Sequence, residues 1–238
     1  MKRPDSLLED LAVACRQLAQ EGHEDGAWGH LSVRDPNQRG FWLKRNGAGL
    51  GEIEGPDDFV LLDFDGKKLE GAGGVHFEWP IHAAILRARS DVSAVGHSHA
   101  MPFRLFADTD VPLQQLMTDS TLFADGIPRF RDTSHLISTA RLGDALAASL
   151  GEGRAVLLAQ HGAAIVGETI PDMAVSMICL SRAIQGQMAL AATGWRVLEA
   201  PRDEALAKAK SVYGGGLIAA HWAFYQRRDE LSRKSLQV

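Results

Sequence analysis

The chain has 238 residues, of which 45% are hydrophobic and 23% charged, and its formal net charge is −5 at pH 7. This composition predicts a single domain over residues 1–238 and excludes a large basic surface, so we expect small molecules as partners, with no nucleic acid and no membrane. No apolar run reaches the roughly 20 residues that span a bilayer and no apolar signal core follows the N-terminus, which predicts a cytoplasmic protein.

The first half of the chain alternates between helical and strand-like patterns. Apolar residues recur at helical spacing over 6–19, and Ser6 is the expected N-cap. The sequence Asp63-Phe-Asp-Gly66 is typical of a hairpin turn, and a second helix is predicted over 78–89 with Pro80 in its first turn. Strand-like segments are found at 30–34, 40–43, 59–63 and 92–97.

The second half contains two strand-like segments, 155–160 and 163–166, which flank His161. Helical patterns cover 139–150, 172–192 and 203–232. Because several neighbouring strands are joined by short turns, we predict an α/β fold in which helices cover a mixed, mainly antiparallel sheet.

Three histidines carry the strongest chemical signal. In the sequence Gly96-His-Ser-His99, alternate side chains of a strand leave the same face, so His97 and His99 can point at one spot. His161 follows the apolar run 156–159 and is placed to supply a third nitrogen. Three neutral donors leave positions open for water or substrate, which predicts a working site for one divalent ion such as Zn, Mn, Fe or Co. The alternative is that these histidines are only a polar strand end and a turn residue.

Glu78 begins the helix predicted over 78–89, and the strand that holds His97 follows that helix after a short turn. Its carboxylate can therefore reach the metal centre, although a carboxylate at a helix N-terminus can also simply cap the helix. His82 lies four residues later on the same face, and we interpret it as a structural residue that holds Glu78 or a backbone group.

Two other motif interpretations fail on spacing. His76 and His82 lie six residues apart, so they do not form the helical His-Glu-x-x-His zinc motif. The segment around Ser98 resembles a nucleophile elbow, but Ala100 stands where the last glycine belongs, which leaves a serine hydrolase as a remote alternative.

These residues resemble the class II aldolase/adducin superfamily over about three quarters of the chain. The matching segments are Gly29–Pro36, Pro56–Asp63, Glu78-x-x-x-His82, Arg89–His99 and Gln160-His-Gly162. The resemblance implies an α/β/α sandwich around a largely antiparallel sheet, a divalent metal held by residues matching His97, His99 and His161, and an acid/base carboxylate matching Glu78. It also implies a homotetramer with active sites at subunit interfaces.

The sequence departs from the sugar-phosphate aldolases of this superfamily where those enzymes bind phosphate. Their hydroxyl and amide groups are replaced by cationic candidates, namely His30, Lys44, Arg45 and His76. Cationic donors suit carboxylates, and nearby aromatic residues can wall a flat ring. These aromatic residues are Trp28, Phe41, Trp42, Phe77 and Trp79.

This pattern is closer to the superfamily's decarboxylase branch, which acts on hydroxylated aromatic or pyridine dicarboxylates. We therefore predict a metal-dependent carboxy-lyase in which Glu78 or His30 protonates the ring carbon and in which Lys44, Arg45, His76 and Trp42 contact the substrate. The alternatives are a retro-aldolase that cleaves a small sugar phosphate or hydroxy-keto acid and, more remotely, a binding domain without catalysis.

Overall fold

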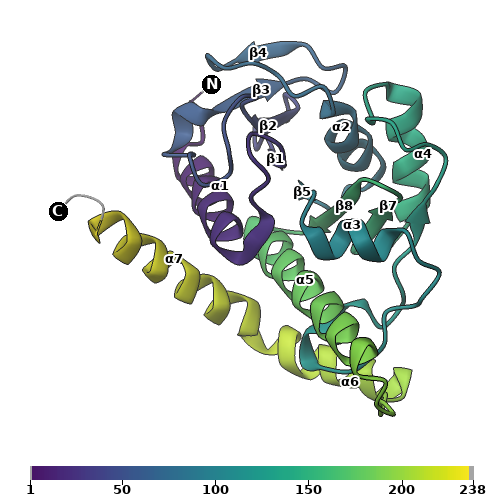
Figure 1. Ribbon diagram of the computed structural model, residues 1–238. Helices are drawn as coiled ribbons and strands as arrows, with labels where there is room; N and C mark the ends of the chain where they lie inside the picture. Colours follow the sequence, from purple (N-terminus) through teal and green to yellow (C-terminus); the bar gives the residue numbers. More distant parts are fainter. Residues whose placement is uncertain (1, 236–238) are drawn as a thin grey trace.

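The computed structural model describes residues 2–235 and contains an eight-stranded sheet in the order β4-β3-β2-β1-β5-β8-β7-β6 (Figure 1). Every neighbouring pair is antiparallel except β6 and β7, which run parallel. The strands are β1 (His30–Arg34), β2 (Phe41–Lys44), β3 (Phe59–Leu62), β4 (Lys68–Glu70), β5 (Ala94–Ser98), β6 (Arg129–Phe130), β7 (Ala155–Leu158) and β8 (Gly162–Gly167). The mainly antiparallel sheet predicted from the sequence is confirmed.

Helices cover both faces of this sheet. The α-helices are α1 (Asp5–Leu18), α2 (Trp79–Ala88), α3 (Met101–Ala107), α4 (Ala140–Leu150), α5 (Ile170–Thr193), α6 (Arg202–Val212) and α7 (Ile218–Ser235). One buried cluster joins α2 and α4 to the sheet, and a second joins α1, α3 and α5 to its opposite face. Two apolar layers on one sheet give the α/β/α sandwich that the resemblance implied.

Several predicted elements begin or end differently in the structure. Helix α1 begins at Asp5 after an N-cap at Pro4, so Ser6 lies inside the helix and the predicted cap was wrong. The helix predicted over 203–232 is two helices, because Gly216 adopts φ 92° in the short turn Tyr213–Leu217 and a left-handed residue ends a regular helix. Helix α3 was not predicted.

Helix α7 lies beside α1 and α5 and packs onto them through a buried ion pair (Figure 1). Arg16 of α1 donates from Nε and Nη2 to the two carboxylate oxygens of Asp229 of α7, each over 2.7 Å. Arg16 also donates from Nη1 to the carbonyl oxygens of Ile53 and Glu54. The last helix is thus fixed to the first by a fully paired guanidinium.

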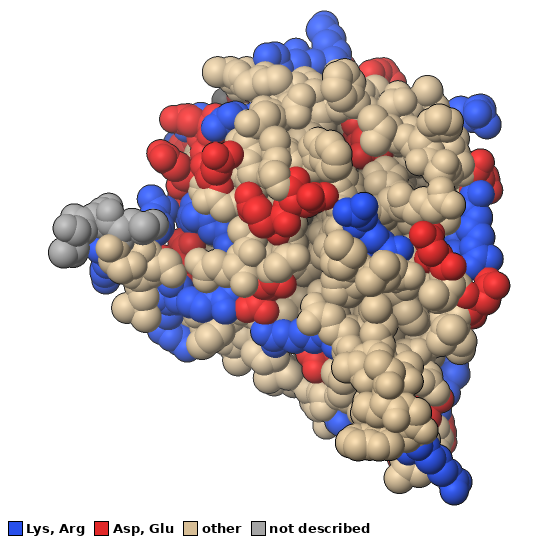
Figure 2. Space-filling view, viewed as in Figure 1, with Lys and Arg blue, Asp and Glu red and all other residues tan. Residues whose placement is uncertain are grey.

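Within residues 2–235, no helix combines the length and apolar character needed to cross a membrane. On the face of these residues drawn in Figure 2, basic and acidic side chains are interspersed, and no continuous basic area is visible.

Candidate active site

Strand β5 brings two histidines to one side of the sheet. His97 pairs with His30 of β1 and with Ala164 of β8, so it lies in the middle of the sheet. His99 follows two residues later, and its Nε2 atom is 2.9 Å from Nε2 of His97. The alternation of side chains along the strand has placed both nitrogens at one point, as the sequence predicted.

The turn between β7 and β8 adds His161. Gln160 adopts φ 56°, and the backbone N–H of His161 donates to the carbonyl of Leu158 over 3.1 Å, which closes the turn. Gly162 then lies so near β5 that a Cβ atom there would be 2.3 Å from the carbonyl oxygen of Ser98. This close backbone approach brings the His161 ring to within 4.9 Å of the rings of His97 and His99, measured between centroids.

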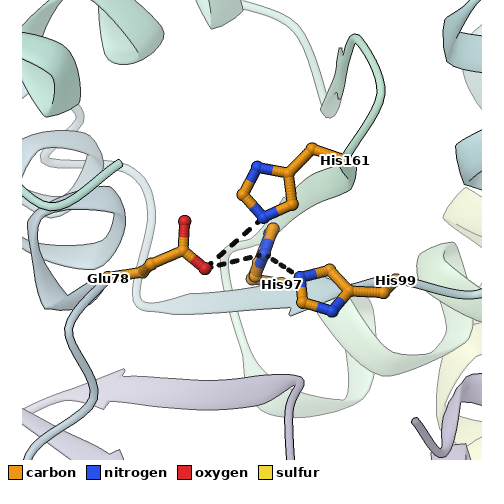
Figure 3. Close-up of side chains that lie close together, drawn as sticks. All are labelled: Glu78, His97, His99 and His161. Atoms are coloured by element: carbon orange, nitrogen blue, oxygen red, sulfur yellow. Dashed lines mark hydrogen bonds and ion pairs between the residues drawn. The ribbon is translucent and has the colours of Figure 1, made fainter. Parts of the chain in front are cut away.

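Glu78 reaches the same point from the N-cap of α2, and Figure 3 shows all four side chains pointing toward one another. Its Oε2 atom lies 3.4 Å from Nε2 of His161 and 3.6 Å from Nε2 of His97. Its Oε1 atom accepts a hydrogen bond from the backbone N–H of Ile137 over 2.8 Å, and no side-chain bond caps α2. The carboxylate therefore faces the histidines rather than its own helix.

These four residues fit a divalent metal ion. Their ligand atoms all lie within 4.8 Å of one another. Nδ1 of His97 bonds the carbonyl oxygen of Ala163 over 3.1 Å, which puts the proton there and leaves the Nε2 lone pair directed at the other ligands. Nε2 of His161 is buried and makes no hydrogen bond within residues 2–235. A buried nitrogen without a partner, beside two imidazoles and a carboxylate, is the donor set that Zn and similar ions bind.

The charge states of these groups suit metal binding. Burial lowers the pKa of His97 well below its ordinary value, and the neighbouring His99 and His161 add to this effect. Burial raises the pKa of Glu78, but contact with His161 and the Ile137 N–H outweighs it, so the pKa lies below the ordinary value. A neutral imidazole and an ionised carboxylate are the protonation states in which these groups act as ligands.

A pocket of about 550 Å³ is lined by three of the four residues, namely Glu78, His99 and His161. Two of its aromatic side chains are largely exposed, Trp28 by 64% and Phe77 by 72%. Its polar and charged lining consists of Asp25, His30, Asn46, His76, Glu78, His99, Arg104, Ser134, Gln160 and His161. The size and the mixture of apolar walls with a few polar groups are typical of a small-molecule site.

Three predicted substrate contacts lie outside this pocket. The ammonium group of Lys44 is buried and donates to the carbonyl of Ala48. Arg45 pairs with Asp58 over 2.7 Å, and Trp42 is buried in the core with its indole N–H on Asp35. The sequence-based assignment of Lys44, Arg45 and Trp42 is therefore corrected. Their charges or donors are already satisfied within the fold.

His30 and His76 do line the pocket, but as neutral rings. Burial lowers the pKa of His76 to about 4, and the charge of Lys44 contributes. Burial also lowers the pKa of His30 well below its ordinary value. The expectation that these two residues act as cations is corrected: near neutral pH they offer hydrogen bonds, not charge.

Two charged pocket residues were missed by sequence reasoning. Arg104 lies on α3, five residues after His99, and its guanidinium makes no hydrogen bond or ion pair within residues 2–235. Asp25 places Oδ2 3.4 Å from Nδ1 of His99. The sequence does show a single arginine shortly after His99. This signal could be used only if the segment Met101–Ala107 was recognised as a helix, which was not predicted.

Comparison with known proteins adds to this geometry. The sequence model of the "Class II Aldolase and Adducin N-terminal domain" family matches residues 9–188. The decarboxylase NovR of Streptomyces niveus is 31% identical over 92% of this chain and 81% of its own length. The 3,4-dihydroxyphthalate decarboxylase of Arthrobacter keyseri is 27% identical over 95% of this chain and 93% of its own length. The solved L-fuculose 1-phosphate aldolase of Glaciozyma antarctica PI12 superposes with a TM-score of 0.83 at 27% identity, over 96% of this chain and 90% of that one.

Proposed function

Since the chain belongs to the class II aldolase and adducin family, we propose that it is a divalent-metal-dependent carbon–carbon lyase that decarboxylates a hydroxylated aromatic or pyridine dicarboxylate. The observation that carries this proposal is the pocket itself. Arg104, whose guanidinium has no partner among residues 2–235, and the exposed rings of Trp28 and Phe77 line the same pocket as the Glu78 and histidine group, which suits a flat, anionic ring. The two relatives described above, from Streptomyces niveus and Arthrobacter keyseri, are both decarboxylases by name.

His97, His99, His161 and Glu78 would hold the metal ion. When bound, such an ion would supply a Lewis acid for a hydroxyl and adjacent carboxylate of the substrate and would stabilise negative charge that develops there. Lowered pKa values keep His97 and His99 neutral and Glu78 ionised, which are the states in which these side chains act as ligands.

Glu78 is also the proposed proton carrier. Because its pKa lies below the ordinary value, it is ionised near neutral pH and accepts the proton of the substrate hydroxyl. The bond between the ring carbon and the carboxylate then breaks, CO2 leaves, and the electron pair stays on the ring carbon. Glu78 returns the proton to that carbon, and solvent restores the hydroxyl proton. His30, which also lines the pocket, is the second candidate for the protonation step.

Arg104 is the proposed anchor for the second carboxylate, in place of the buried Lys44 and the paired Arg45. A guanidinium binds a carboxylate through two parallel N–H donors, which fixes the orientation of the ring as well as its position. Trp28 and Phe77 supply apolar area on which a ring can stack. Binding of the remote carboxylate orients the scissile one over Glu78.

A second function has support from one observation. The aldolase neighbour shares the fold over nearly the whole chain, and Arg104, Asn46 and Ser134 could also bind a phosphate. Under this alternative the same site performs retro-aldol cleavage of a sugar phosphate or hydroxy-keto acid.

One experiment separates the two functions. Protein loaded with Zn, Mn, Fe or Co is incubated with a panel of hydroxylated aromatic and pyridine dicarboxylates, and in parallel with ketose 1-phosphates. We expect saturable CO2 release from a member of the first panel and no aldehyde from the second. Aldehyde release from a sugar phosphate, with no CO2 from any aromatic acid, would replace the proposal by the aldolase. A His97→Ala variant serves as the blank for contaminating activity.

A further inference from the structure

A chain of three buried polar side chains lies directly beneath the pocket. The Ser32 hydroxyl is 2.6 Å from Nδ1 of His82, and Nε2 of His82 is 2.6 Å from Nδ1 of His30. Ser32 and His82 have no exposed surface, and His30 is 2% exposed. His30 is the only one of the three that lines the pocket within the described part of the chain. The chain thus connects the interior of the protein to the substrate site.

Strand geometry explains this alignment. His30 and Ser32 are two residues apart on β1, so both side chains leave the face of the sheet that α2 covers. His82 lies inside α2, where its ring meets both. From the sequence, His82 was predicted to hold Glu78 or a backbone group, whereas its ring bonds the side chains of His30 and Ser32.

The hydrogen bonds fix which nitrogen of each ring carries a proton. Within residues 2–235 the Ser32 hydroxyl bonds only to His82, so its hydrogen is donated to Nδ1 of His82. Burial lowers the pKa of His82 to about 3, which keeps that ring neutral with its single proton on Nε2. His82 then donates from Nε2 to Nδ1 of His30, and the single proton of a neutral His30 resides on Nε2.

The opposite arrangement is disfavoured for a physical reason. If His82 donated from Nδ1 to Ser32, the buried hydroxyl hydrogen would have no acceptor within residues 2–235. A buried donor without an acceptor costs its full desolvation. In the first arrangement the one donor left over is Nε2–H of His30, the residue of the chain that lines the pocket.

We propose that Ser32 and His82 are positioning residues that fix His30 with its Nε2–H directed at the pocket, where it donates a hydrogen bond to a carboxylate oxygen of the substrate. The carboxylate acceptor in this inference rests on the proposed function, whereas the fixed tautomer of His30 does not. It assigns His30 a constant role as a neutral donor, which complements the charge of Arg104 on the same ligand.

The test is the tautomer of His30, measured by long-range 1H–15N correlation on zinc-loaded protein labelled with 15N-histidine. We expect His30 to carry its proton on Nε2 and expect added phthalate to shift the Nε2 resonance. In a Ser32→Ala variant we expect His30 to lose this single tautomer, because His82 can then carry its proton on either nitrogen. Ser176→Ala removes a different buried serine, on α5, and should leave His30 unchanged.

Two further variants separate this role from simple packing. His82→Phe fills the same space without a donor, and we expect it to raise KM about tenfold through loss of one hydrogen bond to a charged oxygen. His82→Gln can still donate to Nδ1 of His30, and we expect it to restore most of the loss. Equal activity of the Phe and Gln variants would mean that His82 only packs.

The result that overturns the inference needs neither substrate nor variants. A wild-type His30 that carries its proton on Nδ1, or that exchanges between both tautomers, would contradict it even if CO2 release is observed. Conversely, if His30 has a fixed Nε2–H tautomer but the protein shows no decarboxylase activity, the proposed function is contradicted. The role of Ser32 and His82 in positioning His30 is then still supported.

Discussion

At the scale of single residues, three of the four candidate metal ligands contact a neighbour that is not itself a candidate ligand. The carbonyl of Ala163 orients His97, the N–H of Ile137 orients Glu78, and Asp25 lies 3.4 Å from the His99 ring. Such outer contacts fix both the direction and the protonation of a ligand. These contacts hold His97, His99 and Glu78 in the group described above.

Glu78 gives the first prediction at this scale. Glu78→Gln keeps the size of the side chain and an oxygen that can accept from Ile137, but it removes the group that accepts and returns a proton. We expect turnover to fall roughly 100-fold or more, within the range of acid/base groups, with the fold retained. Steady-state kinetics together with circular dichroism check this. An unchanged kcat would return Glu78 to a structural role.

Arg104 and Arg45 form a matched pair of arginines. Arg104 lines the pocket and its guanidinium has no partner in the described part of the chain, whereas Arg45 is paired with Asp58 outside the pocket. We therefore expect Arg104→Gln to raise KM about tenfold or more, since a charge-assisted hydrogen bond contributes about 1.5–3 kcal/mol, and Arg45→Gln to change KM little. If instead Arg45→Gln raises KM and Arg104→Gln does not, the sequence-based assignment of the carboxylate anchor is the correct one.

At the scale of elements, the turn between β7 and β8 decides whether His161 reaches the site. The turn depends on Gln160 at φ 56° and on the contact of Gly162 with the β5 backbone. A side chain at position 162 would push β8 away from β5 at the point where the ligands converge. Only a glycine permits this approach.

Gly162→Ala tests the turn directly. Its Cβ would lie 2.3 Å from the Ser98 carbonyl oxygen, so the two strands must separate. We expect a loss of about 2 kcal/mol or more in unfolding free energy and weaker metal binding, measured by urea titration and by metal analysis. The control is Gly214→Ala, where a new Cβ meets no heavy atom within 4 Å. Equal behaviour of the two variants would show that the close approach is not required.

The sequence predicted most elements and the close grouping of Glu78 with His97, His99 and His161, because strand alternation and helical spacing are local properties. It did not predict that Trp42, Lys44 and Arg45 lie outside the pocket, since that depends on strand register. Trp42 pairs with Val33, and both side chains join the cluster on the α1 side of the sheet, with Lys44 two residues further along β2. His30 and His97 leave the opposite face. Register between β1, β2 and β5 is fixed by long-range packing, which a single sequence does not display.

At the scale of the whole molecule, buried neutral histidines make stability depend on pH. Burial lowers the pKa of His23 to about 4 and that of His82 to about 3, compared with an ordinary 6.5. Below pH 6.5 the unfolded chain binds protons at these positions while the folded chain does not. The free energy of unfolding is therefore expected to be constant above pH 6.5 and to fall as the pH decreases toward 4.

His23 permits a specific test, because it lies on the opposite side of the sheet from the pocket, bonded to Ser98. Between pH 7.5 and 5, one such histidine costs about 2 kcal/mol at about 1.4 kcal/mol per pH unit below 6.5. We expect the metal-free His23→Gln variant to lose about that much less stability than the wild type over this range. His135→Gln, at an exposed position, is the control. A His23→Gln variant with the wild-type pH dependence would contradict the account.

The assembly of the molecule remains a prediction. Trp28 and Phe77 are largely exposed at the mouth of the pocket, and the homotetramer implied by the family resemblance would place a second copy near such a site. Sedimentation equilibrium of the full chain tests this state.

The most direct measurement of the central account is the metal content of the purified protein. We expect one divalent ion per chain in the wild type, and we expect His99→Ala to bind it at least 10–100-fold more weakly, because one of three imidazole ligands is lost. The control His221→Ala removes a histidine of α7, outside the site, and should retain the wild-type stoichiometry and affinity. A His99→Ala variant that binds one ion per chain with unchanged affinity would contradict the metal centre, and with it the proposed lyase.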